Sequence, residues 1–408
     1  MITVLYIILA ILIFGFLIFI HELGHFLAAR ACKVTVHEFS IGMGPKIVSF
    51  CPGRKKAEKK KKREAEDSAE LENEFTVDPR PPKPITSEGS EADTEAEDEN
   101  GNEPIYTAYS LRALPFGGYV SMEGENEDSN DPNALSNKNV WQRMFIMIAG
   151  PAMNLILGFV LMFIMVCGAS KLASTVIVYD HSGENAETVY TSEATGLKSD
   201  DKIIKIGKVS VHTGNEVAYE IMYQGHQPID IVVERNGERI VLENVSFPTV
   251  EENGTTLGLY DFRFYATTDS RVGLWERITT TFWRSCSTVK MVWDSLGGLF
   301  SGRFGVESVS GPVGVTEVIV EAAQASWDQL LYIVTVITIN LGVMNLLPIP
   351  ALDGGQLLVC VVELIIRRPI SEKVKGYINF AGLAVLMLFM VVIAAKDIIS
   401  LAFRFFGG

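Results

Sequence analysis

Long apolar runs separate the polar parts of this chain. Four runs are long enough to cross a bilayer, which takes about 20 mostly apolar residues in a helix. The third run also contains two prolines and the glycine pair Gly354-Gly355, which predict that its helix is broken. We therefore predict four transmembrane helices, at residues 1–35, 140–170, 328–366 and 376–404.

Two shorter segments combine alternating apolar residues with Gly and Pro turn signals. They are residues 36–50, with Gly42–Pro45 as the turn signal, and residues 105–125, with Pro115–Val120. Clusters of Gly and Pro are typical of turns and unfavourable inside helices. Each segment is predicted to form a short β-hairpin.

Between residues 175 and 265 the pattern becomes that of a small α+β domain. One helix is expected at Glu216–Tyr223, and Asn236-Gly237 predicts a type I′ hairpin turn. Three β-rich segments are expected at Lys202–Ile206, Ile229–Glu234 and Arg239–Val245. Residues 270–300 then mix Trp and Phe with Arg and Lys, which predicts an amphipathic helix lying on the outer membrane surface.

Composition supports the same fold class. The chain has 408 residues, of which 48% are apolar and 21% are charged, a balance typical of a polytopic membrane protein with polar insertions. Its net charge of −14, without a basic groove, excludes nucleic acid as an expected partner. The five cysteines are scattered without paired spacing, so we interpret them as packing residues.

Residues 51–104 form a lysine run followed by an acidic tract rich in Pro, Ser and Glu. Such a segment cannot bury enough apolar surface to fold, so we predict a disordered tether. Its basic residues, and those after the third span, place both connections in the cytoplasm by the positive-inside rule. Both termini and the domain at residues 175–265 are then extracytoplasmic. The first span lacks a basic start and a cleavage site, so we expect it to be retained.

The end of the first span carries the clearest chemical signal. His21 and His25 are four residues apart, so on a helix both imidazoles project from one face and can bind one metal ion. Glu22 lies beside them, where a general base is needed to take a proton from water. The alternative is a pair of core histidines that form hydrogen bonds inside a helix bundle.

A catalytic zinc site needs a third protein ligand and an open position for water. Asp353 is the candidate, because it follows the prolines that break the third span, and broken backbone at membrane depth requires a polar environment. Its alternative role is to cap the helix that restarts there, and both roles can hold at once.

These motifs resemble those of the site-2 protease family of intramembrane zinc metalloproteases, in particular its bacterial members with one extracytoplasmic PDZ domain. His21–His25 matches the family's HExxH and Asn345–Gly354 matches its NxxPxPxLDG; Gly150–Asn154 is similar to its GPxxN. Gly311–Gly314 is similar to a segment before its third span, and the two predicted hairpins are similar to its membrane-associated β motifs. The resemblance covers nearly the whole chain except the insertion.

The resemblance implies a multi-pass protein of the bacterial cytoplasmic membrane that uses Zn²⁺ to cleave peptide bonds within or near transmembrane segments. His21, His25 and Asp353 would be the metal ligands, Glu22 the catalytic base, and Asn345 a substrate-binding residue, which could instead cap a helix or bond between helices. Expected substrates are trimmed single-span membrane proteins, such as anti-sigma factors, or remnant signal peptides.

The domain at residues 175–265 would be PDZ-like and would bind peptides or substrate ectodomains. In its turn, Ser199-Asp200 replaces the family's usual Pro-Gly. The remaining histidines have no metal-ligand spacing and are expected to be ordinary surface or loop residues: His37, His181, His212 and His226.

Two other functions are compatible with parts of the sequence. One is a membrane adaptor without protease activity, in which the metal site is structural; Glu22 argues against it, because a structural site needs no base. The other is a metal transporter, which requires further ligands along the other spans.

Overall fold

The computed structural model describes the chain at residues 2–52, 107–125, 129–182, 189–252, 254–268, 272–305 and 309–406. Apart from Cys51 and Pro52, the predicted charged insertion at residues 51–104 lies outside the described residues.

Four helices are long and apolar enough to cross a membrane within the described residues, as predicted. They are α1 (Ile2–Ala31), α3 (Val140–Gly168), α8 (Trp327–Asn345) and α10 (Glu372–Phe406). The third predicted span is broken, because α8 ends at Asn345 and a second helix, α9 (Asp353–Ile366), begins after the prolines.

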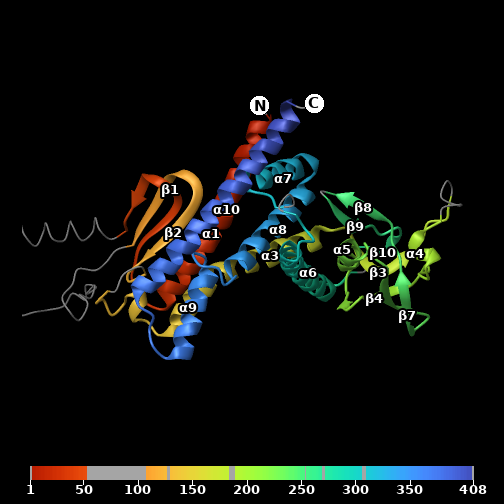
Figure 1. Cartoon of the computed structure of the whole chain (residues 1–408), viewed down its shortest axis with the longest axis horizontal. Helices are drawn as coiled ribbons and strands as arrows, with labels where there is room; N and C mark the ends of the chain where they lie inside the picture. Colours follow the sequence, from red (N-terminus) through yellow and green to blue (C-terminus); the bar gives the residue numbers. More distant parts are fainter. Residues whose placement is uncertain are drawn as a thin grey trace, which may run out of the picture. The chain divides into compact units, whose positions relative to one another are not determined.

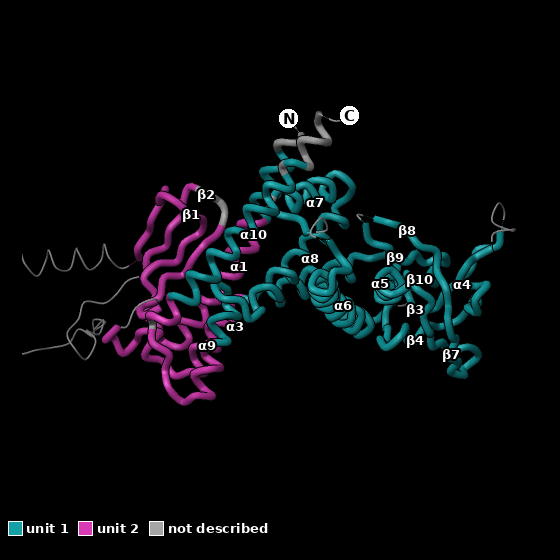
Figure 2. The backbone as a smooth tube through the Cα atoms, viewed as in Figure 1, with its two compact units in different colours: residues 1–13, 151–358, 377–408 teal, residues 14–150, 359–376 magenta. Residues whose placement is uncertain are grey.

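The chain divides into two compact units, shown in Figure 2. Unit 1 comprises residues 1–13, 151–358 and 377–408, and unit 2 comprises residues 14–150 and 359–376. The boundary passes through helices α1, α3, α9 and α10.

In unit 2, strands β1 (Val36–Phe50) and β2 (Ala108–Met122) form one sheet, which Figure 1 shows as paired, arched strands. Residues 38–41 pair with both ends of β2, and residues 46–50 pair with residues 109–112. The prediction of two separate hairpins is therefore wrong in its pairing. Each segment does turn at its glycines, but its hydrogen-bond partners come from the other segment, which lies far away in sequence; Phe50, for example, pairs with Tyr109.

A cluster of polar side chains holds this sheet together at Glu38. Arg112 Nη2 and Lys46 Nζ lie 3.0 Å from its carboxylate oxygens, and the Tyr119 hydroxyl donates a hydrogen bond of 3.0 Å. Burial alone would raise the pKa of the Glu38 carboxyl, but these bonds and one from Ser110 outweigh it and lower the pKa to about 2. Glu38 is therefore ionised at neutral pH and links both strands.

Unit 1 contains the α+β domain. Its main sheet has the strand order β10-β3-β4-β6-β7, with β5 paired to β4. The strands are β3 (Lys171–Val178), β4 (Lys202–Ile206), β5 (Val209–Ser210), β6 (Ile229–Arg235), β7 (Glu238–Val245) and β10 (Arg263–Thr268). The shorter elements are α4 (Thr191–Ala194), α5 (Gly214–Gln224), β8 (Thr249–Glu252) and β9 (Thr255–Gly258).

The predicted local structure of this domain is confirmed. Asn236 and Gly237 have φ of 54° and 84°, as a type I′ turn between β6 and β7 requires. Asp200, which stands where glycine is usual in the family's turn, has φ of 69°. Asp tolerates this left-handed conformation better than most residues, so this position can be occupied by a residue other than glycine.

Two further helices of unit 1 precede α8. The predicted amphipathic helix is α6 (Leu274–Phe300), and it is followed by α7 (Pro312–Ala325), which sequence analysis did not predict. Exposed aromatic side chains form one stripe along α6, since they recur at nearly whole numbers of helical turns: Trp275, Phe282, Trp293 and Phe300.

Glycines bring α3 and α8 into close contact. A Cβ atom on Gly158 of α3 would overlap with Ile339 of α8, and one on Gly342 would lie 3.0 Å from Leu155. Small residues at helix contacts are typical of membrane bundles, where packing rather than water drives association.

Candidate metal centre

The two histidines of the motif lie on one face of α1, as their spacing predicts. Both side chains are buried: the exposed fraction is 8% for His21 and 7% for His25. Their Nε2 atoms are 3.3 Å apart, and the rings meet at 79°. The two imidazoles therefore present neighbouring nitrogens, which is the arrangement that a shared ion requires.

Helix α3 fixes the orientation of His25. Its Nδ1 donates a hydrogen bond of 2.8 Å to the carbonyl oxygen of Ile146, if the proton is on that nitrogen. That tautomer leaves a lone pair on Nε2, as a metal ligand needs. The helix can approach so closely because residue 150 is glycine; a Cβ atom there would overlap with Nε2 and lie 2.7 Å from two ring carbons.

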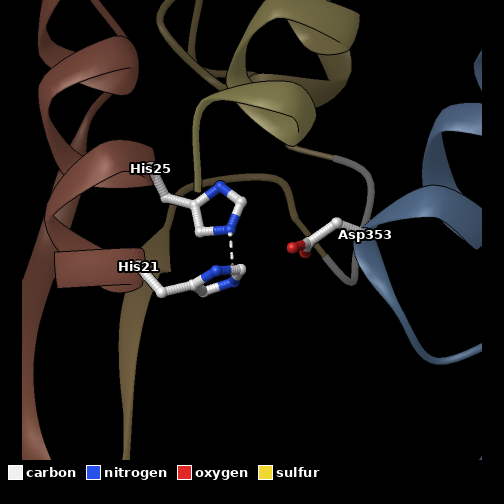
Figure 3. A group of neighbouring side chains, drawn as sticks. All are labelled: His21, His25 and Asp353. Atoms are coloured by element: carbon white, nitrogen blue, oxygen red, sulfur yellow. Dashed lines mark hydrogen bonds between the residues drawn. The ribbon is translucent and has the colours of Figure 1, made fainter. Parts of the chain in front are cut away.

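Asp353 brings a carboxylate oxygen close to the two imidazoles. One atom from each of His21, His25 and Asp353 lies within 4.8 Å of the others, and Figure 3 shows the carboxylate turned toward the two rings. In the described part of the chain, no other group of three His, Cys, Asp or Glu residues meets this criterion.

The loop that precedes Asp353 is tightly folded. A Cβ atom on Gly354 would overlap with the Leu347 carbonyl, and one on Gly355 would overlap with the Ile349 carbonyl oxygen. Ala351 has φ of 72°, a left-handed conformation that L-residues adopt only at a cost in energy, whereas glycine adopts it freely. Asp353 is also the first residue of α9, where a carboxylate is favourable beside the helix N-terminus, and this position is compatible with a ligand role.

Glu22 follows His21 on α1 and is half-buried. Strand β2 passes beside it, because a Cβ atom on Gly118 would lie 3.0 Å from Glu22 Cγ and 2.9 Å from the Ser40 carbonyl oxygen. Glu22, the expected catalytic base, therefore lies next to the sheet of β1 and β2.

The two asparagines of the motifs differ in their surroundings. Asn154 of α3 is fully buried. Asn345 is half-buried at the last position of α8, and its side chain makes no hydrogen bond to another described residue. In the described part of the chain, the Asn345 side chain therefore forms neither a helix-capping hydrogen bond nor a hydrogen bond to another helix.

The other four histidines lie outside this cluster, as predicted. His37 and His181 pair with carboxylates, at 2.5 Å from Glu123 and 2.9 Å from Glu193. His212 stacks on a tryptophan and His226 contacts an arginine.

Sequence reasoning missed the supporting residues of the site. It considered Gly150 only as part of a motif, and gave no role to Gly118 or Ile146. The glycine of Gly150–Asn154 was the available signal, because a glycine inside a helix is unfavourable unless a close contact requires it.

Comparison with known proteins decides the family. The family model described as Peptidase family M50 matches residues 9–58 and 102–389. The chain belongs to the M50, or site-2 protease, family.

Its relatives within the M50 family share nearly the full length. A protein of Clostridium acetobutylicum assigned as a zinc metalloprotease is 32% identical over 396 residues, which cover 96% of this chain and 97% of that one. The regulator of sigma-W protease RasP of Bacillus subtilis is 29% identical over 429 residues, covering 95% and 97%. The zinc metalloprotease RasP of Bacillus licheniformis is 28% identical over 424 residues, also covering 95% and 97%.

Membership of the M50 family identifies the chain as a zinc metalloprotease, and its candidate spans identify it as a bacterial membrane protein. The adaptor and transporter alternatives are therefore not supported. The transporter alternative also lacks the further ligand clusters that it requires among the described residues.

The residues present fit zinc. Two imidazoles and one carboxylate are a common donor set for catalytic zinc, which leaves one position open. Two nitrogens bound to one tetrahedral zinc are about 3.3 Å apart, which agrees with the separation of 3.3 Å between the two Nε2 atoms. The Ile146 carbonyl supplies the outer hydrogen bond that zinc-binding histidines usually make.

Proposed function

We propose that this M50 protease cleaves peptide bonds within or near the transmembrane segments of single-span membrane proteins. In this proposal His21, His25 and Asp353 hold the zinc and Glu22 is the catalytic base. The observation that carries it is the convergence of three ligand atoms within 4.8 Å, two of them on an apolar helix long enough to span a bilayer. Ionisable residues at such depth are costly and are usually functional.

When bound, zinc would lower the pKa of a water molecule and polarise the carbonyl of the scissile bond. Glu22 accepts the proton from the attacking water and returns it to the leaving amine. The Ile146 carbonyl keeps His25 in one tautomer, so that its Nε2 remains available as a ligand. The burial of both histidines excludes bulk water around the ligands.

The substrate must be extended at the site, because the peptide bonds of a closed helix are not accessible to a protease. We place the substrate beside the sheet of β1 and β2, onto which an unwound segment can add as a strand. The contact of Gly118 with Glu22 supports this position, since it puts a β-strand next to the base. Asn345, half-buried at the end of α8, would donate a hydrogen bond to the substrate backbone.

We base the proposed substrate class on the family resemblance and on the name of one relative. We propose anti-sigma factors already trimmed outside the membrane, or remnant signal peptides; the name of the Bacillus subtilis relative, a regulator of sigma-W protease, supports the first class. The α+β domain at residues 175–265 would be PDZ-like and would bind the peptide or ectodomain of the substrate.

The proposed orientation puts the α+β domain and both termini outside the cytoplasmic membrane. The insertion at residues 51–104 and the basic connection between α9 and α10 would face the cytoplasm. Cysteine labelling from either side of intact cells, using single cysteines at Ser199 and Lys373, tests this orientation. Labelling of residue 373 from outside would contradict it.

The function is tested by reconstituting the full chain in liposomes with a single-span protein that lacks most of its ectodomain. The wild type is expected to cleave it in or near the span, and Glu22→Gln to lose at least about 1,000-fold in rate while keeping its zinc. Glu276→Gln, in the first turn of α6, is the matched control and should retain full activity. Cleavage by Glu22→Gln at the wild-type rate would refute the role of Glu22, and a wild type that cuts only soluble peptides would refute the substrate class.

A further inference from the structure

Within unit 1, helix α10 has one narrow seam of buried positions. Most of its side chains are exposed, as expected for a span that faces lipid, but Gly382 and Leu386 are half-buried and Ile393 and Asp397 are buried. Their spacings of four, seven and four residues place them on one face of the helix.

At one end of this seam, Gly382 lies against the loop that carries Asp353. A Cβ atom on residue 382 would overlap with Cβ of Pro350, and would lie 2.7 Å from the Pro350 carbonyl oxygen and 2.8 Å from its carbonyl carbon. Two of these atoms belong to the backbone, so a side chain at position 382 could be accommodated only by moving the loop or the helix.

The loop has little freedom to absorb such a movement. Pro350 precedes Asp353 by three residues, and Ala351 between them is held in the left-handed conformation, with φ of 72°. The amide of Leu352 donates to the carbonyl of Ile349 at 3.2 Å, and a Cβ atom on Gly355 would lie 2.9 Å from Cα of Pro350. A displacement of Pro350 is therefore passed on to Asp353.

At the other end of the seam, α10 is tied to the start of α7. The Asp397 carboxylate accepts hydrogen bonds of 3.0 Å from the amides of Gly311 and Gly314, and Lys396 Nζ donates one of 2.6 Å to the Val309 carbonyl oxygen. A carboxylate at a helix N-terminus is favourable, and bonds to a charged acceptor are strong. These bonds oppose a shift of α10, so a side chain at position 382 would displace the loop at Pro350 as a unit, together with Asp353.

We propose that Gly382 is a positioning residue for the metal site. Because it has no side chain, the fourth span can lie directly against Pro350, and this contact holds the loop where the Asp353 carboxylate reaches the two histidines. The three atoms nearest to a Cβ atom at position 382 all belong to Pro350, and none belongs to a proposed ligand. The inference depends on the proposed role of Asp353 as a ligand.

The test uses the full-length protein in detergent, freed of zinc and titrated with Co²⁺, whose visible absorption reports its ligand geometry. Gly382→Ala is expected to weaken Co²⁺ binding by about tenfold or more and to change the spectrum, as the loss of supporting contacts does at other metal sites. Gly382→Val should have a larger effect. The matched control is Gly376→Ala on the same helix, because no atom lies within 4 Å of a Cβ atom there.

If Gly382 has only a structural role, Gly382→Ala should lower the thermal stability of the metal-free protein. If Gly382 positions the metal site, Gly382→Ala should change the Co²⁺ affinity and spectrum, while its metal-free stability stays near that of Gly376→Ala. Wild-type affinity and spectrum in Gly382→Ala would overturn the inference. A wild-type protein that binds Co²⁺ but never cleaves a membrane substrate would refute the proposed function instead, and leave the positioning role of Gly382 intact.

Discussion

Gly150 on α3 lies so close to His25 on α1 that a Cβ atom at position 150 would overlap with Nε2, the nitrogen that faces His21. The Ile146 carbonyl, one turn earlier on α3, accepts the hydrogen bond from the other ring nitrogen of His25. One face of α3 therefore determines both the position and the tautomer of a proposed zinc ligand.

Gly150→Ala should therefore impair metal binding. The added methyl group must displace His25 or α3, and we expect zinc affinity to fall by about 10- to 100-fold, the usual effect of damage to the residues around a ligand. Competition with a chromogenic chelator measures this affinity. Gly168→Ala in the same helix is the control, because a Cβ atom there meets nothing within 4 Å. Equal zinc affinities for the two variants would contradict the account.

Ala351→Gly should stabilise the protein. The left-handed conformation costs an alanine roughly 1–2 kcal/mol, and glycine adopts it freely at a smaller cost in chain entropy. The expected net gain is up to about 1 kcal/mol, seen as a higher unfolding temperature in detergent. Ala384→Gly, at an exposed position of α10, should instead lower stability, because glycine is unfavourable inside a helix. A loss of stability in both variants would show that Ala351 is not strained.

The sheet of β1 and β2 should lose stability in acid. The pKa of Glu38 is lowered from 4.5 to about 2 in the folded chain, so its ion pairs contribute fully above about pH 4.5 and are lost as the pH falls toward 2. Glu38→Gln should therefore unfold at a lower temperature than the wild type at pH 7, and the difference should shrink between pH 4.5 and pH 3. The control Glu251→Gln alters an exposed residue of β8. A difference between Glu38→Gln and the wild type that is constant with pH would contradict the shifted pKa.

The sequence was most informative where physical constraints are local. Apolar runs of bilayer length are recognisable by themselves, and Pro348 and Pro350 remove backbone donors, so the break between α8 and α9 was predictable. The four-residue spacing of His21 and His25 fixed their common helix face in the same way.

Long-range packing could not be predicted in this way. The contacts of Gly150 with His25 and of Gly382 with Pro350 join residues far apart in sequence, and a single glycine does not reveal its neighbour. The pairing of β1 with β2 was missed for the same reason, since a turn signal such as Gly42–Pro45 predicts a bend but does not identify the partner strand. Helix α7 was not predicted, and its start lacks the side-chain cap that would have marked it in the sequence.

The central claim is that His21, His25 and Asp353 bind one zinc ion together. X-ray absorption at the zinc edge, measured on the purified full-length protein and on Asp353→Ala, tests it most directly. The account predicts about one zinc per chain with two imidazole nitrogens and the remaining ligands oxygen, and loss of most of that zinc in the variant. A wild-type spectrum without two imidazoles, or an unchanged zinc content and spectrum in Asp353→Ala, would contradict it.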